Sequence, residues 1–88
     1  MRGDMEVAMF THHVEGYALR CEVFRNLDGT YRITVLTRED LPYSVERRWE
    51  MPEHLWHRSE DEAHRWARYV CRGITHVDPW TGPAYTVY

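Results

Sequence analysis

The sequence contains no lysine: all eleven basic residues are arginine, and fourteen acidic residues outnumber them. The net charge of -3 argues against a general nucleic-acid binder or a protein held on an anionic membrane, because both classes are normally strongly basic. Two explanations of the missing lysine stay open. A GC-rich coding sequence produces it, and so does a surface that uses the planar, bidentate contacts of arginine.

Cysteine is scarce as well. Cys21 and Cys71 are the only two, which excludes a disulfide framework and the paired Cys-x-x-Cys ligands of a zinc site. Cys21 falls on the expected core face of a strand, and Cys71 borders the apolar stripe of an expected helix. We therefore expect two buried, reduced thiols, while a single bridge between them stays open.

Long apolar runs are also missing. No stretch approaches the length of a transmembrane helix, and the short apolar patch near the start does not resemble a signal peptide. We expect a cytoplasmic protein that does not interact with a membrane.

The sequence lacks the Gly-x-Ser-x-Gly, P-loop, Gly-x-Gly-x-x-Gly and His-Glu-x-x-His motifs of common enzyme classes. His54 and His57 form a His-x-x-His pair in an expected loop, but zinc needs three or four convergent ligands. The acidic run at residues 60–62 is explained by its place at the start of a helix. We expect no enzymatic activity, no cofactor and no metal site.

A well-specified helix is present over residues 59–73. Ser59 and Glu62 have the spacing of a capping box, and the acidic residues 60–62 lie on the first turn, where the helix dipole is positive. Gly73 is placed to end the helix in the left-handed conformation. Apolar residues at helical spacing predict the face that meets the core; they are Ala63, Trp66, Ala67, Val70 and Ile74.

A β-hairpin precedes this helix. Residues 17–24 alternate between apolar and polar, and Asn26-Leu27-Asp28-Gly29-Thr30 is typical of a type I turn followed by a left-handed Gly29. This turn predicts the register and places the core residues of both strands on one face. The predicted pairs are Asn26 with Thr30, Val23 with Ile33, and Cys21 with Val35.

Two further strands are expected over residues 6–12 and 44–51. The 88 residues suffice for one domain, since two separate cores would be too small. The expected fold class is α+β: an antiparallel meander of three to four strands, one C-terminal α-helix packed on one face, and a short C-terminal tail. Residues 1–5 are expected to form an untethered terminus. Residues 75–88 are expected to fold back or to dock on a partner, with a short strand over residues 84–88.

Aromatic residues make up 14% of the chain, more than a core of this size hides. Trp, Tyr and Arg dominate binding hot spots, and the edges of a meander can pair with a second copy or a partner strand. We therefore expect a non-enzymatic module that binds another protein, either itself as a homodimer or a regulatory partner. The expected binding residues are the anchors Trp49, Trp80, Tyr85 and Tyr88 and the polar contacts Arg20, Arg32 and Arg47.

Single-stranded nucleic-acid binding is the alternative, because the outer sheet face interleaves Arg20 and Arg32 with Phe24, as a stacking platform would. The order of strands followed by a helix is also similar to the latter part of a double-stranded RNA-binding domain, which implies RNA binding. Where that family has a basic helix start, this chain carries acidic residues 60–62, which would repel phosphate. Protein binding is therefore the favoured hypothesis.

Overall fold

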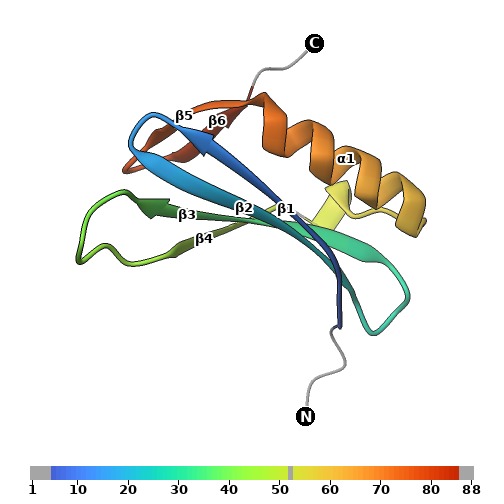
Figure 1. Cartoon of the computed structure of the whole chain (residues 1–88). Helices are drawn as coiled ribbons and strands as arrows, with labels where there is room; N and C mark the ends of the chain where they lie inside the picture. The colour runs from blue at the N-terminus through green and yellow to red at the C-terminus, as the bar shows by residue number, and fades with distance from the viewer. Residues whose placement is uncertain (1–4, 52, 86–88) are drawn as a thin grey trace.

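The computed structural model describes residues 5–51 and 53–85. Four strands form an antiparallel sheet in the order β1-β2-β3-β4, followed by one helix and a two-stranded sheet (Figure 1). The predicted α+β class with a C-terminal helix is confirmed. The elements are β1 (Met5–Val14), β2 (Tyr17–Arg25), β3 (Tyr31–Glu39), β4 (Arg47–Glu50), the 3-10 helix η1 (Glu53–Leu55), α1 (Glu60–Gly73), β5 (Ile74–Asp78) and β6 (Gly82–Tyr85).

The β2–β3 hairpin has the predicted register. The Asn26 amide donates to the Thr30 carbonyl at 2.7 Å, and Gly29 has the left-handed φ of 88° that the turn requires. Val23 lies opposite Ile33, and Cys21 lies opposite Val35. All four of these apolar side chains are buried and face α1.

The outer strands differ in extent from the prediction. β1 begins at Met5, so this residue belongs to the sheet and not to a free terminus. β4 is shorter than predicted, because Ser44 is used to close the preceding loop. Its amide donates to the Leu41 carbonyl at 3.3 Å and its hydroxyl to the Glu39 carbonyl at 2.7 Å.

The helix α1 packs on one face of the sheet, but with a different stripe from the one predicted. Its buried residues are Ala63, Ala67 and Cys71, at i, i+4 and i+8. Such small side chains let the helix backbone approach the sheet closely, which leaves no room for an indole between them. Trp66 was predicted to lie in the core, and this is wrong: it lies at the side of the helix and is 47% exposed.

At each end of α1, one part of the prediction is confirmed and the other part is wrong. The Ser59 hydroxyl accepts from the Glu62 amide at 3.4 Å, as in a capping box, but the Glu62 carboxylate contacts His57 Nδ1 at 3.1 Å. The helix ends at Gly73 without a left-handed residue, because buried Ile74 is already extended, with φ -73° and ψ 120°. Of the described helices, none is long and apolar enough to span a membrane.

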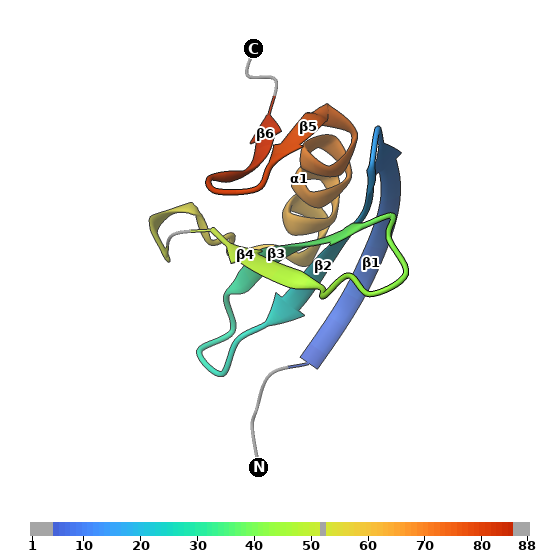
Figure 2. The same cartoon turned by 90° about the vertical axis from the view of Figure 1, so that its left-hand side faces the viewer.

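The β5–β6 hairpin lies on the same side of the sheet as α1, beside it (Figure 2). Its turn follows Asp78, as expected. Its second strand begins at Gly82, earlier than the predicted strand over residues 84–88, and residues 86–88 lie outside the described part of the chain.

The side of the sheet opposite to α1, which we call the open face, is covered by neither α1 nor the β5–β6 hairpin.

The Asp78 carboxylate holds this turn together and makes its stability depend on pH. It accepts from the Trp80 amide at 2.7 Å and the Thr81 amide at 3.0 Å. These bonds lower the pKa of Asp78 below its usual range, and hydrogen bonds from Thr30 lower the pKa of Asp28 in the same way.

Since both groups are easier to deprotonate in the folded state, the unfolded state binds more protons near pH 4. We expect the free energy of unfolding to fall as the pH drops from about 4 toward 2. The Asp78→Asn variant keeps an acceptor oxygen but does not titrate, so it should lose less stability over this range. Urea denaturation at a series of pH values measures this, and an identical pH profile for the two proteins would contradict it.

Candidate functional site

The predicted binding residues do not lie on one surface. Arg20 and Arg32 lie on the open face, whereas Arg47 and Trp49 lie on the side of the sheet that carries the hairpin. Trp80 lies on the turn of the hairpin and is 86% exposed. Tyr85 is the last residue of β6, and Tyr88 lies outside the described residues.

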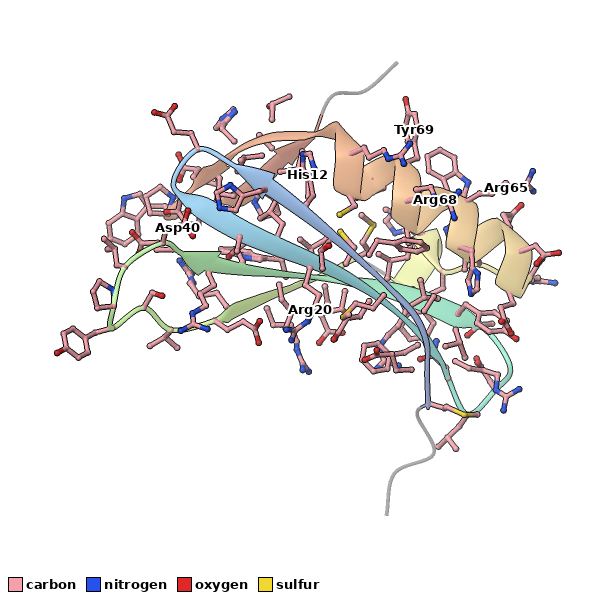
Figure 3. The ribbon with its side chains drawn as sticks, in the orientation of Figure 1. His12, Arg20, Asp40, Arg65, Arg68 and Tyr69 are labelled. Atoms are coloured by element: carbon pink, nitrogen blue, oxygen red, sulfur yellow. The ribbon has the colours of Figure 1, made fainter. Side chains whose placement is uncertain are left out.

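On the open face, Arg20 is bound by carboxylates. It points away from α1 (Figure 3), and its guanidinium donates to Glu22 at 3.0 Å and to Glu46 at 3.1 Å. Glu22 is only 7% exposed, so this ion pair is partly shielded from water. The charge of Arg20 is therefore balanced within the chain.

Arg32 is similarly engaged. It donates to the Asn26 side chain, and its Nε lies 3.7 Å from the Glu50 carboxylate. Its guanidinium also lies 4.8 Å from the centre of the Phe24 ring, over the face on which a base would stack. These contacts reduce the support for a nucleic-acid stacking platform on the open face.

Arg47 and Trp49 join β4 to the β5–β6 hairpin. The Arg47 guanidinium lies over the Trp49 ring at 4.5 Å and donates to the Pro79 carbonyl at 2.5 Å. The Trp49 indole donates to the Thr37 hydroxyl at 2.9 Å, and its ring lies against Gly82. These contacts give both side chains a role within the fold.

The two thiols are free and buried, as predicted. Cys21 on β2 shares a hydrogen bond with Cys71 on α1, and this bond together with burial raises the pKa of Cys21. The Cys71 thiol also donates to the Phe10 carbonyl at 3.8 Å. Both cysteine side chains pack in one buried core cluster with Leu19, Val35 and Ile74, so we assign the pair a packing role. Within residues 5–51 and 53–85, no three His, Cys, Asp or Glu side chains converge on a common metal position.

A different surface combines exposed aromatic and basic side chains. We call it the α1 surface and define it as Leu55, His57, Arg65, Trp66, Tyr69 and Arg72. Leu55 and Trp66 are each 47% exposed, and Tyr69 is 45% exposed. Arg65 and Tyr69 project from α1 away from the sheet (Figure 3).

The aromatic rings of the α1 surface support one another. His57 stacks on Trp66 with 6.2 Å between ring centres, and Tyr69 meets Trp66 edge to face at 5.6 Å. His57 is held in turn by the Glu62 carboxylate and by two backbone hydrogen bonds with Tyr31, of 2.7 and 2.8 Å. The exposed indole of Trp66 therefore packs against the His57 ring, whose position is held by these contacts.

A hollow of about 490 Å³ adjoins these rings. Its wall is mostly apolar and is formed by Ile33, Met51, His54, Leu55, Trp56, His57, Trp66 and Val70. The buried indole Nε1 of Trp56 has no hydrogen-bond partner among the described residues.

The arginines of the α1 surface differ from Arg20 and Arg32 of the sheet in that they form no ion pair with a described residue. None of the ion pairs in the described part of the chain involves Arg65 or Arg72. The nearby carboxylates of Glu60 and Glu62 contact His64 and His57. Both arginine side chains are exposed, so their donors remain available to a carboxylate from another molecule.

Sequence reasoning missed this surface because it assigned Trp66 to the core. The available signal was the spacing of Ala63, Ala67 and Cys71, which gives a complete helical stripe of small residues without Trp66.

In comparisons with known proteins, the chain matches no family model, no curated protein and no solved structure.

Proposed function

We propose that this protein is a non-enzymatic module that binds another protein through the α1 surface. The observation that carries the proposal is the pair of half-exposed rings, Trp66 and Tyr69, beside an apolar hollow. Exposing large aromatic rings in water is unfavourable, and partly exposed Trp and Tyr beside a pocket are typical of binding hot spots.

The partner's chemistry follows from the same residues. An apolar side chain of the partner fills the hollow next to Trp66, and its carboxylates meet the exposed guanidiniums of Arg65 and Arg72. The partner is therefore a protein segment that is both acidic and apolar. Trp80, which the sequence predicted as an anchor, lies on the turn of the β5–β6 hairpin outside the α1 surface and is not part of this contact.

The test begins with a tagged chain in nuclease-treated lysate, washed at low and then high salt. A protein captured in stoichiometric amount is purified, and its affinity for variants is measured by calorimetry. Trp66→Ala should weaken binding by tenfold to a hundredfold, about 1.4 to 2.7 kcal/mol, as hot-spot truncations do. Circular dichroism establishes that the variant is folded.

Trp80→Ala is the matched control, because it removes an exposed indole outside the α1 surface and should change the affinity less than threefold. Wild-type affinity for Trp66→Ala would reject the α1 surface as the binding site. Nucleic acid that is retained only without nuclease and released by salt would favour the nucleic-acid alternative.

A further inference from the structure

The two edge strands of the sheet differ in how well they are protected. β4 spans four residues, contains Arg47 and Arg48, and is joined to the β5–β6 hairpin. β1 spans ten residues, contains no proline, and has Glu6 as its one residue of the Asp, Glu and Arg types. Short strands, charged side chains and proline are the usual means of preventing edge-to-edge pairing. Among the described strands, β2 alone pairs with β1, and the other edge of β1 is the outer edge of the sheet (Figure 2).

Hydrogen bonding within the sheet determines which groups β1 presents at this edge. Because Asn26 bonds to Thr30, the even-numbered residues of β2 bond to β3. The odd-numbered residues of β2 therefore bond to β1, where they face residues 8, 10, 12 and 14. The backbone amides and carbonyls of Met9, Thr11 and His13 consequently point outward.

The regular part of β1 is complementary to itself. A bulge separates Glu6 from Ala8, and residues 8–14 then pair one to one with β2, so that Thr11 is the centre of the regular segment. In an antiparallel pair of two such strands, Thr11 faces Thr11 of the second copy, and Met9 faces His13. These are the residues whose backbone groups point outward, and each pair exchanges two hydrogen bonds, about six in all.

We propose that two copies of the chain pair through the outer edges of β1, antiparallel and with Thr11 on the two-fold axis. The four strands of each copy then form one continuous sheet with both α1 helices on the same side, because opposite residues in an antiparallel pair point to the same face. Residues 8–14 contain no Asp, Glu or Arg, so no like charges oppose one another. Met9, which is 49% exposed, becomes covered.

This pairing uses no residue of the α1 surface and is independent of the proposed function. Trp66→Ala should leave self-pairing unchanged, and loss of self-pairing should leave capture of a different protein unchanged. Either idea can therefore fail without the other.

The experiment measures molecular mass by sedimentation over a concentration series. The wild-type chain of 10.7 kDa should double in mass as its concentration rises. Thr11→Lys and Thr11→Glu should each weaken self-association at least tenfold, since like charges then meet on the two-fold axis. An equimolar mixture of the two variants should restore the doubled mass, because Lys then faces Glu.

The control is Thr75→Lys, which adds the same charge at an exposed threonine on β5 and should associate as the wild type does. A wild-type chain that stays monomeric over the series overturns the proposal, as does a Thr11→Lys variant that associates normally. If each variant is monomeric and the mixture is too, the register is wrong. Hydrogen exchange adds a second readout, since the Thr11 amide should gain protection as the wild-type concentration rises.

Discussion

Replacing Ile74 with alanine is expected to lower the free energy of unfolding by about 3 kcal/mol, within the usual range for a buried isoleucine. Ile74 is 2% exposed and packs in a core cluster with Leu19, Cys21, Val35 and Cys71. It is also the residue at which α1 passes directly into β5. Its truncation therefore leaves a cavity where helix, sheet and hairpin meet.

Denaturant unfolding of the variant measures this effect, and an unchanged m-value would show that the same surface is exposed on unfolding. In a chain of this size the loss corresponds to a fall in Tm of about 15 °C. Thr75→Ala is the control, because Thr75 is the next residue after Ile74 and its side chain is exposed. This variant should change the free energy of unfolding by less than about 0.5 kcal/mol. A loss below about 1 kcal/mol for Ile74→Ala would mean that the site is not packed as described.

The second large effect is expected at Gly82, where alanine should cost about 3 kcal/mol. Gly82 has a φ of 91°, a conformation that costs other residues about 1 kcal/mol. A Cβ there would also lie 2.7 to 2.9 Å from three ring atoms of Trp49. Because Thr37 and Arg47 hold that ring, relieving the contact requires a shift of the hairpin, which adds about 2 kcal/mol.

Gly29→Ala separates the two causes. Gly29 has a similar φ of 88°, but no atom lies within 4 Å of its added Cβ. It should therefore show the backbone cost of about 1 kcal/mol without the steric one. Equal losses for Gly82→Ala and Gly29→Ala in denaturant unfolding would contradict the packing of the hairpin against Trp49.

Local chemistry was sufficient to predict the centre of the fold. The Asn26–Thr30 turn sets the register of β2 and β3 through hydrogen bonds between residues close in sequence. Ser59 begins α1 for the same reason, since its hydroxyl reaches an amide three residues away. The α+β class follows from these two elements and their apolar faces.

The α1 surface could not be predicted in this way, because it depends on distances between segments far apart in sequence. Trp66 looked like a core residue by helical spacing, but the close approach of Ala63 and Ala67 to the sheet moves its indole to the side. Arg20 and Arg32 were predicted as polar contacts for a partner, but Glu46 and Glu50, which are distant in sequence, lie 3.1 and 3.7 Å from their guanidinium nitrogens.

The sequence by itself determined the hairpin register, the start of the helix and the apolar faces that bring sheet and helix together, because short-range hydrogen bonds and side-chain periodicity specify them. Only the tertiary structure decided which arginines stay exposed, on which side of the sheet the last hairpin lies, and which strand is left at an unprotected edge. These depend on packing volumes and on charges contributed by distant segments, which no local pattern contains.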